Sequence, residues 1–441
     1  ALRITEDEWS IPRGWLGRIQ VLADESLSYG VLYDPKSNGV VRLAAAAARE
    51  IAKKQQMQGL GSLPAEEREA LEAKLQHAFH NNQHSFLKQT PTYLETGALN
   101  QLEILLQNGC NLRCRYCFAE GGSYGQKTVR LTPERGKSIV RTLVDQGIHK
   151  ISRITFFGGE PSTLPDTMEA ICEECTRLFE GGQLKAVPEF FIITNCISIS
   201  SKCMEVLRRY RIHITISIDG PAEINDQLRV FPNGYKTHDL VLRNLQRLRE
   251  FGIEPAMVEA TYTAIHERAG LTREQTIAAL QKELGIQSIY LCDCDCRDPV
   301  FQPAHEEDSA IMERDNQDIK KLFVEQNYGE VPLELLRFVI QTSKKLNMQE
   351  IPDCLCDAGL QSLTIAANGD IYPCHLFISG RYMQLGNIFT SDFDISLHKL
   401  ALEGQRMYTK LGRESCRTCW ARNFCSMCFF RIYQAEWFAD A

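Results

Sequence analysis

The sequence predicts an α/β fold built around a parallel sheet of six β-α repeats. Short apolar runs of strand length alternate with helical stretches, and the runs cover residues 102–107, 153–157, 190–194, 212–218, 257–263 and 288–291. Strands that are apolar on nearly every residue and alternate with helices are typical of parallel sheets. The helix expected over 133–146 has clear ends, because Thr132 can cap it, Pro133 fits its first turn and Gly147 stops it. In β/α folds of this kind, we expect functional side chains at the carboxyl ends of the strands.

Composition narrows the class of protein. The 441 residues carry a net charge of -7, which argues against broad binding to nucleic acid or to an acidic membrane. No apolar run approaches the roughly 18 residues of a membrane-spanning helix, and the first residues lack the basic-then-apolar order of a secretory signal. The 17 cysteines, an odd number gathered in tight clusters, indicate metal ligands rather than a disulfide framework. We therefore expect a cytoplasmic protein in a reducing environment.

Three closely spaced cysteines follow the first strand of the repeats. Cys110, Cys114 and Cys117 stand in the order C-x-x-x-C-x-x-C, and Tyr116 directly precedes the third. Three thiolates can hold three irons of a four-iron cluster and leave the fourth iron open to an outside ligand. A zinc knuckle is the alternative, although zinc sites usually combine C-x-x-C pairs with distant partners. The spacing and its context resemble the radical S-adenosylmethionine (radical SAM) superfamily, in which the open iron binds SAM and one electron cleaves SAM to a 5′-deoxyadenosyl radical.

Two further segments match the radical SAM pattern at the ends of later strands. Gly158, Gly159 and Glu160 follow the second strand, and the resemblance implies that they contact the amino group of SAM. Ser217 ends the fourth strand and Arg229 follows it, which matches the family's contacts to the SAM carboxylate. A guanidinium group is a suitable partner for a carboxylate. A plain strand-to-helix turn is the alternative for the glycine segment.

The resemblance also implies roles for two more polar side chains and a closed arrangement of the strands. Asn195 follows the third strand, where it could reach the ribose of SAM or simply form a turn. Tyr116 is expected on the adenine side, with ordinary packing as the alternative. The six repeats are expected to form the family's partial (β/α)6 barrel over residues 93–300.

A second set of cysteines lies in the C-terminal region, which we expect to form a domain over residues 351–441. Their order, C…G-x-x-x-x-C…C-x-x-C-x-x-x-x-x-C, resembles the SPASM domain, an extension of radical SAM enzymes that carries up to two auxiliary [4Fe-4S] clusters. Zinc knuckles are the alternative, since thiolate spacing separates zinc from iron–sulfur sites poorly. The resemblance assigns Cys356, Cys374 and Cys428 to a first auxiliary cluster, with Cys354 as a possible fourth ligand, and Cys416, Cys419 and Cys425 to a second.

The C-terminal pattern departs from the family in two ways. Only Ser426 and Met427 separate Cys425 from Cys428, where the family has three residues, and no cysteine follows Cys428. One auxiliary cluster is therefore expected to use a non-cysteine ligand, to borrow a thiol or to keep an open iron.

The remaining cysteines have more ordinary explanations. Cys292, Cys294 and Cys296 alternate just after the sixth strand, where they could lend a thiol or form an inert strand end. We expect Cys172, Cys175, Cys196 and Cys203 to be packing residues. His375 and Asp357 flank predicted ligand cysteines, where support of the cluster is expected rather than proton transfer.

The two ends of the barrel region are joined to smaller segments. Apolar stretches at 16–22, 29–33 and 40–43, with a turn over 34–39, predict a small sheet containing a hairpin. Helices are expected over 44–56 and 64–79. An α+β domain of this kind over residues 1–92 resembles the winged-helix element that recognises peptides in many modifying enzymes, and a structural cap is the alternative. Residues 301–350 are expected to form a helical bridge.

The function that the resemblance implies is the maturation of a ribosomally made peptide (a RiPP). The segments 110–119, 371–375 and 419–425 look most like those of maturases that form thioether or carbon–carbon cross-links. Such an enzyme implies SAM, the radical SAM cluster and auxiliary clusters as cofactors. The implied partners are a precursor peptide, expected to contain cysteine, and a flavodoxin- or ferredoxin-type electron donor. The alternatives are a sulfatase-maturating (formylglycine-forming) enzyme, a peptide epimerase and, outside the enzymes, an iron–sulfur electron carrier.

Overall fold

The computed structural model describes residues 20–22, 29–34, 39–44, 86–294, 296, 298–304, 344–346, 348, 350–379, 383–417, 419 and 421–437. The chain divides into two compact units. The first unit contains Ala1–Thr90, Glu306–Cys356 and Gln405–Ala441, and the sheet unit contains Pro91–His305 and Asp357–Gly404.

The sheet unit is built on a nine-stranded sheet with the order β10-β9-β8-β7-β6-β5-β12-β13-β14. All six predicted strands are present, and neighbouring members of this set are parallel, as the sequence predicts. They are β5 (Ala98–Gln107), β6 (Lys150–Gly158), β7 (Glu189–Thr194), β8 (His213–Ser217), β9 (Met257–Tyr262) and β10 (Ile289–Asp293).

Three further strands extend this sheet from the C-terminal region, which the sequence does not predict. β12 (Ser362–Ile365) pairs in parallel with β5, and β13 (Asp370–Tyr372) and β14 (Gly386–Asn387) follow in antiparallel order. The first part of the cysteine-rich region therefore shares a core with the predicted barrel strands.

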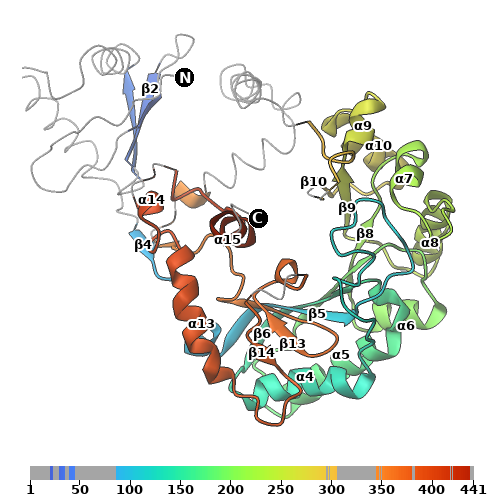
Figure 1. The fold of residues 1–441 in the computed structure, drawn as a ribbon, viewed down its shortest axis with the longest axis horizontal. Coiled ribbons are helices and arrows are strands. Elements are labelled where there is room, and N and C mark those ends of the chain that lie inside the picture. Colours follow the sequence, from blue (N-terminus) through green and yellow to red (C-terminus); the bar gives the residue numbers. More distant parts are fainter. Residues whose placement is uncertain are drawn as a thin grey trace, which may run out of the picture. The chain divides into compact units, whose positions relative to one another are not determined.

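Helices cover the outer side of the curved sheet (Figure 1). The predicted helix over 133–146 is α4 (Pro133–Asp145), and the Thr132 side chain accepts a hydrogen bond from Arg135 N at its start. The longer helices that follow are α5 (Pro165–Glu180), α6 (Ser201–Arg209), α8 (His238–Glu250) and α10 (Arg273–Leu284). Shorter elements are α3 (Tyr93–Thr96), η2 (Pro161–Thr163), α7 (Ala222–Leu228), α9 (Ala264–Arg268), η3 (His375–Phe377), η4 (Ile395–Leu397) and α13 (His398–Gln405).

The strands alternate between a packed face and a more open inner face. On β9, Val258, Ala260 and Tyr262 are buried, whereas Glu259 and Thr261 are half-buried. On β5 the same period of two separates Leu102, Ile104 and Leu106 from Glu103 and Gln107, which are polar but are also buried. The inner face therefore carries polar side chains on both strands.

The residues of the first unit that the structure describes form two small sheets. β1 (Gln20–Leu22), β2 (Tyr29–Asp34) and β3 (Gly39–Ala44) form an antiparallel sheet, and the hairpin that the 34–39 turn predicts is present between β2 and β3. β4 (Phe86–Lys88) pairs in parallel with β11 (Glu350–Pro352). The described part of this unit also contains η5 (Arg406–Tyr408), α14 (Glu414–Arg417) and α15 (Phe429–Trp437).

Some expectations concern parts of the chain outside the described residues. These are the helices over 44–56 and 64–79 and most of the bridge over 301–350. Within the described part, no helix has both the length and the apolar character needed to span a bilayer.

Candidate functional site

The loop that follows β5 carries the three-cysteine motif. Cys110, Cys114 and Cys117 are half-buried, and backbone N–H groups of Leu112 and Gly121 donate to Sγ of Cys110 and Cys117, each over 3.4 Å. Burial raises the pKa of Cys110 to about 11 and that of Cys114 to about 12, and the charges of neighbouring thiols in the motif add to both shifts. Cysteine binds metal as the thiolate. A bound metal ion would therefore have to lower the pKa values of Cys110 and Cys114 again.

This donor set fits an iron–sulfur cluster. The three sulfurs are close enough for their charges to interact, and two of them already accept N–H groups of the kind that stabilise thiolate ligands. No three His, Cys, Asp or Glu side chains among the described residues lie close enough to share a single metal ion. A four-iron cluster binds each thiolate through a different iron, so it does not require them to meet at one point.

The glycine segment after β6 packs directly against the cysteine loop. A Cβ atom on Gly159 would lie 2.0 Å from the Gly109 carbonyl oxygen, and one on Gly158, where φ is +117°, would lie 2.4 Å from the Gln107 carbonyl oxygen. Both positions therefore require glycine, because the two backbones touch where a side chain would stand.

Glu160 ties this segment to the end of β7. Its buried carboxylate accepts hydrogen bonds from Ser162 N at 3.1 Å, Thr194 Oγ1 at 2.6 Å and Asn195 N at 2.8 Å. Burial raises the pKa of Glu160, although these three donors oppose the shift. A carboxylate has about four acceptor positions, so about one remains for a ligand.

Asn195 connects β7 to the cysteine loop. Its Nδ2 donates to Asn111 Oδ1 at 2.8 Å and lies 3.6 Å from Cys110 Sγ, while its Oδ1 accepts from Ile197 N at 3.0 Å. The hydrogen bond from Ile197 N forms the turn that the sequence leaves open as an alternative. The contacts with Asn111 and Cys110 show that the same side chain also touches the cysteine motif.

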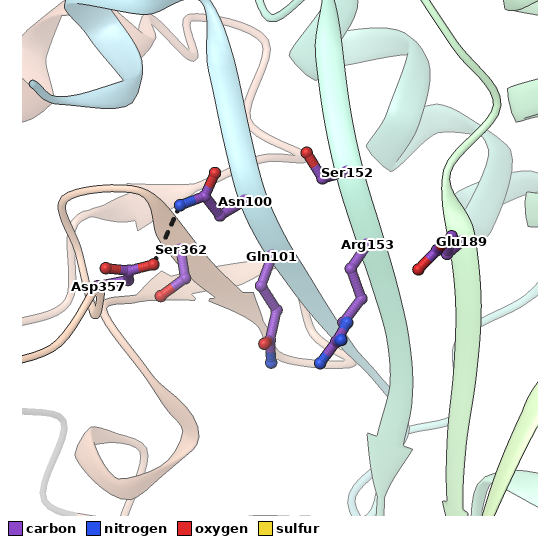
Figure 2. A pocket seen from close by; sticks show the side chains of 7 residues that line it. All are labelled: Asn100, Gln101, Ser152, Arg153, Glu189, Asp357 and Ser362. Carbon is purple, nitrogen blue, oxygen red and sulfur yellow. Dashed lines mark hydrogen bonds between the residues drawn. The ribbon is translucent and has the colours of Figure 1, made fainter. Parts of the chain in front are cut away.

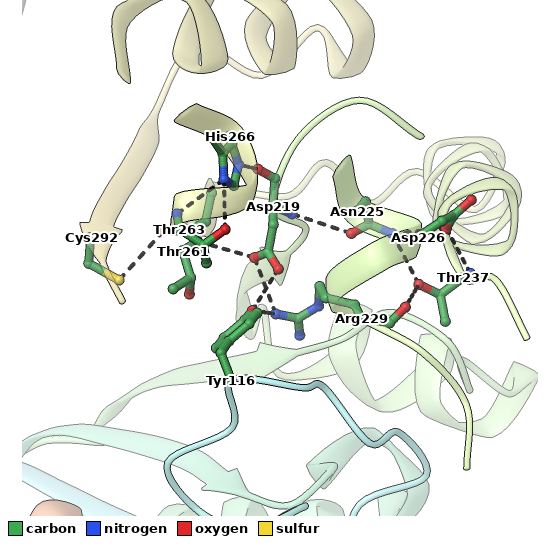
Figure 3. A network of polar contacts seen from close by, with 11 residues as sticks. Tyr116, Asp219, Asn225, Asp226, Arg229, Thr237, Thr261, Thr263, His266 and Cys292 are labelled. Atoms are coloured by element: carbon green, nitrogen blue, oxygen red, sulfur yellow. Dashed lines mark hydrogen bonds and ion pairs between the residues drawn. The ribbon is translucent and has the colours of Figure 1, made fainter. Parts of the chain in front are cut away.

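Tyr116 and Arg229 meet at a buried carboxylate, Asp219 (Figure 3). Tyr116 Oη donates to Asp219 Oδ2 over 2.6 Å, and Arg229 Nη1 lies 2.8 Å from Tyr116 Oη and 3.5 Å from Asp219 Oδ1. Burial raises the pKa of Tyr116 well above its usual value. Burial alone would lower the pKa of Arg229, but Tyr116, Cys114 and Asp219 raise it, so the guanidinium stays charged.

The carboxyl end of β9 and the residues that follow it hold Asp219 in place. Thr261 N donates to Asp219 Oδ1 over 3.1 Å, and His266 Nε2 lies 2.8 Å from the Asp219 carbonyl oxygen (Figure 3). Because Thr263 N donates to His266 Nδ1, the ring proton of a neutral His266 is on Nε2, which donates to that carbonyl. Asp219 joins three segments in this way. The sequence pattern predicts no role for Asp219, although an acidic residue that follows a strand and precedes a glycine is a usable signal.

Ser217 ends β8 on the inner face, where Glu259 of β9 is its register neighbour. Burial raises the pKa of Glu259, and the charges of Arg229 and His375 oppose this shift. His375 Nδ1 lies 2.9 Å from Glu103 Oε2, and its ring packs against Phe157 with centroids 4.9 Å apart. Next to Ser217, the inner face therefore carries two carboxyl groups, those of Glu259 and Glu103, and the imidazole of His375.

The alternating cysteines at the end of β10, of which Cys292 still belongs to the strand, do not share one open face. Cys292 is half-buried and its Sγ lies 3.5 Å from the Ala260 carbonyl oxygen. Cys294 and Cys296 are buried in an apolar cluster with Leu228, against which Tyr116 packs. Because β10 ends at Asp293, the strand alternation does not continue to these two thiols. The four cysteines expected to be packing residues, Cys172, Cys175, Cys196 and Cys203, are indeed fully buried.

The predicted auxiliary ligands belong to both units. Cys374 lies in the sheet unit, where its charge and that of Cys117 both raise the pKa of Tyr124 after the larger effect of burial. The other six lie in the first unit: Cys354, Cys356, Cys416, Cys419, Cys425 and Cys428, all half-buried. There, Lys410 is buried within the electrostatic reach of Cys354 and Cys425, and its pKa is lowered by burial. A buried ammonium group beside thiols fits a negatively charged thiolate cluster.

A separate pocket of about 360 Å³ opens at the amino ends of the strands (Figure 2). Gln101, Arg153 and Glu189 are register neighbours across β5, β6 and β7 and line it. Asn100 Nδ2 donates to Asp357 over 3.1 Å at its edge. The cysteine loop follows the other end of β5, so this pocket is not part of the candidate site.

Comparison with known protein families identifies two domains in the chain. Residues 104–280 match the family model of the radical SAM superfamily, and residues 354–420 match SPASM, an iron–sulfur cluster-binding domain. The chain carries a radical SAM domain and a SPASM domain. The two domains imply the cofactors expected from the sequence, which are SAM, a four-iron cluster and auxiliary clusters. The individual residues that bind them remain predictions.

Relatives of the radical SAM domain are diverse in function. The chain is 28% identical over 170 residues to the radical SAM cyclopropyl synthase TigE of Paramaledivibacter caminithermalis, an alignment that covers 36% of this chain and 34% of the relative. It is 31% identical over 160 residues to the mitochondrial GTP 3′,8-cyclase of Arabidopsis thaliana, which covers 36% and 37%. The chain thus spans only about a third of the length of these curated relatives.

Solved structures show a similar fold over more of the chain. Streptococcus suis SuiB bound to its precursor peptide SuiA covers 94% of this chain and 97% of its own, with a TM-score of 0.51 and 18% identity. The structure of anSMEcpe with bound AdoMet covers 74% and 88%, with a TM-score of 0.52 and 19% identity. At such identities the likeness concerns the fold alone.

Proposed function

We propose that this radical SAM enzyme is a peptide maturase that forms a thioether or carbon–carbon cross-link in a ribosomal precursor peptide. The observation that carries the proposal is the joint presence of the two domains in a chain whose fold matches SuiB, a protein solved with its precursor peptide, over 94% of its length. The polar inner face next to the Tyr116–Asp219–Arg229 network adds support, because a polypeptide presents amide and side-chain groups that such a face can bind.

The proposed SAM contacts follow from the groups that remain available. Arg229 uses one nitrogen on Tyr116 and Asp219, and the rest of its planar fork can bind the SAM carboxylate together with Ser217. The backbone of Gly158 and Gly159 and the remaining acceptor position of Glu160 would bind the amino group. Tyr116 would lie against the adenine, and Asn195 would keep the cysteine loop next to the ribose.

When bound, SAM and the cluster held by Cys110, Cys114 and Cys117 supply the 5′-deoxyadenosyl radical, and the auxiliary clusters supply an acceptor for the surplus electron. The chain's own contribution is positional. It would hold the peptide bond to be modified against the inner face and exclude water while the radical is present. A flavodoxin- or ferredoxin-type protein is the proposed electron donor.

The test is anaerobic reconstitution with SAM and a reductant, followed by co-expression with a short peptide encoded beside the gene. Cross-linking removes two hydrogen atoms from the peptide, and tandem mass spectrometry then shows a block to fragmentation between the two joined residues. Absence of 5′-deoxyadenosine from fully reconstituted protein would indicate an electron carrier instead of an enzyme.

Two other peptide reactions give different readouts. A new aldehyde that reacts with a hydrazide probe would indicate formylglycine formation, which the fold match to anSMEcpe keeps as the second candidate. Uptake of one deuterium from D₂O, with no other change in mass, would indicate epimerisation. Either result replaces the cross-linking proposal.

A further inference from the structure

Four rings pack in a row in the sheet unit. The imidazole of His375 lies against two phenylalanine rings, with its centroid 4.9 Å from that of Phe157 and 5.8 Å from that of Phe118. Phe118 also meets Tyr124 in an edge-to-face arrangement with centroids 6.0 Å apart. These four side chains form what we term the ring row. The carboxyl end of β6, η3 and the cysteine loop contribute to it, so the fold brings together residues that are far apart in sequence.

A buried carboxylate fixes the imidazole of this row. Glu103 is 5% exposed, and its Oε2 accepts hydrogen bonds from His375 Nδ1 and from Thr364 Oγ1, each over 2.9 Å. Glu103 and Thr155 are register neighbours on β5 and β6, and Phe157 comes two residues after Thr155, so the carboxylate and the Phe157 ring lie on the same inner face. The imidazole plane is therefore held in place before a ligand binds.

The ring row is open at one side. Phe118 is 47% exposed and the His375 side chain is 30% exposed, whereas Tyr124 is 2% exposed. A single exposed phenylalanine is ordinary on a protein surface, but Phe118 continues a set of rings whose positions are fixed. The open side therefore offers a preformed surface of ring atoms.

Three members of the ring row are next in sequence to predicted cofactor ligands or contacts. The pairs are Phe118 after Cys117, Phe157 before Gly158, and His375 after Cys374. The ring row is thus continuous with the candidate site. A side chain that packs on these rings would lie beside the place of the proposed radical chemistry.

We propose that the ring row is a subsite for an aromatic side chain of the peptide substrate, which stacks on Phe118 next to the residue that is modified. Aromatic rings prefer offset-stacked or edge-to-face partners, and the rings of the row already meet one another at such tilted angles. A cationic side chain is less suited, because the carboxylate that contacts the row, Glu103, is itself buried and its Oε2 already accepts two hydrogen bonds. The subsite rests on the proposed function, since it requires a peptide substrate.

The experiment measures binding without turnover, on the full chain reconstituted with its clusters and SAM but given no reductant. The probes are three blocked tripeptides, acetyl-Gly-X-Gly-amide, in which X is Trp, Leu or Lys. Ligand-observed NMR titration gives their dissociation constants. The Trp peptide should bind about fivefold tighter than the other two, because ring stacking adds to the apolar contact.

Two variants locate the source of this preference. Phe118→Leu keeps an apolar side chain but removes the ring, so it should abolish the preference for Trp. Phe179→Leu is the matched control and should keep the preference, because Phe179 is 44% exposed but belongs to helix α5.

A photoreactive probe tests the position in the parent protein itself, so the result does not depend on whether a variant keeps its clusters. With p-benzoylphenylalanine as X, irradiation should attach the peptide to residues 118–124, 157 or 375–377, as located by tandem mass spectrometry. Equal binding of the three tripeptides would overturn the subsite. So would a Trp preference that survives in iron-loaded Phe118→Leu, or attachment only to other segments.

The subsite and the proposed function fail separately in these measurements. A protein that modifies its peptide but shows no preference for the Trp tripeptide refutes the subsite alone. A protein that shows the preference and the expected attachment but modifies no peptide supports the subsite and contradicts only the maturase reaction.

Discussion

The Tyr116 hydroxyl donates a hydrogen bond to Asp219 over 2.6 Å and so joins the loop of three cysteines to the end of β8. Arg229 closes the same group, at 2.8 Å from the tyrosine oxygen and 3.5 Å from the carboxylate. Asp219 is therefore in a position to fix both the cluster loop and the proposed partner of the SAM carboxylate.

Replacing Asp219 should weaken SAM binding. Asp219→Asn keeps the size of the side chain but removes the charge that pairs with Arg229, so the guanidinium should lose its fixed orientation. Hydrogen bonds to charged groups contribute about 1.5–3 kcal/mol, and we expect SAM affinity to fall about tenfold or more. Calorimetry of the reconstituted protein measures this directly. Tyr116→Phe should have a smaller effect, and an unchanged affinity in both variants would contradict the proposed role of this network.

Gly159 should tolerate no side chain. In Gly159→Ala the new Cβ would meet the Gly109 carbonyl oxygen at 2.0 Å, so the cysteine loop must move away from β6. We expect a loss of a few kcal/mol of stability and incomplete loading of the three-cysteine cluster. Iron content and thermal unfolding test both effects. Gly404→Ala is the matched control, because Gly404 lies in α13 with no atom within 4 Å of the added methyl group, and alanine favours helix.

His398 should make the stability of the protein depend on pH. Burial lowers the pKa of His398 to about 4, and its Nδ1 lies 2.6 Å from the Tyr93 hydroxyl. Because the folded pKa lies below the unfolded value of about 6.5, the neutral form stabilises the fold above pH 6.5, and this contribution is lost as pH falls toward 4. The change is on the order of 3 kcal/mol over that range.

Urea unfolding at a series of pH values measures this dependence. His398→Gln cannot be protonated in this range, so its unfolding free energy should fall less steeply between pH 6.5 and pH 4 than that of the parent protein. Equal slopes in the two proteins would show that other groups are responsible.

The buried thiols after β10 should be dispensable for the clusters. Cys294 and Cys296 are 7% and 9% exposed and pack among apolar side chains, so their replacement removes packing and no ligand. A Cys294→Ala, Cys296→Ala variant should lose about 1–3 kcal/mol of stability and keep its full iron and sulfide content. A loss of one cluster's iron from the folded variant would instead identify these residues as the lenders of the missing thiol.

The sequence predicted the parts of the fold that have a local signal. Each of β5 to β9 is an apolar run with a helix after it, β10 is an apolar run as well, and the packed face of these strands is visible in their own residues. β12 has no such signal, because it is four residues long and its partner β5 lies about 260 positions earlier in the chain. Its place in the sheet is decided by a distant contact that no window of sequence contains.

The candidate site likewise has parts that a local sequence signal predicts and parts that depend on distant contacts. The cysteine motif and the glycine segment could be read from spacing, since steric and ligand requirements fix neighbouring residues. Asp219 could not be recognised as a shared partner, because Tyr116 lies 103 positions before it and only the fold brings them together.

The most direct measurement is the formation of 5′-deoxyadenosine together with modified peptide by the reduced, anaerobic protein. The parent chain, given SAM and the peptide encoded beside it, should release 5′-deoxyadenosine and a peptide lighter by two hydrogen atoms. The variant with Cys110, Cys114 and Cys117 replaced by alanine should form neither while it retains auxiliary iron. A parent protein with full iron content that cleaves SAM but leaves every tested peptide unchanged would contradict the peptide maturase function, and one that does not cleave SAM would contradict the enzyme itself.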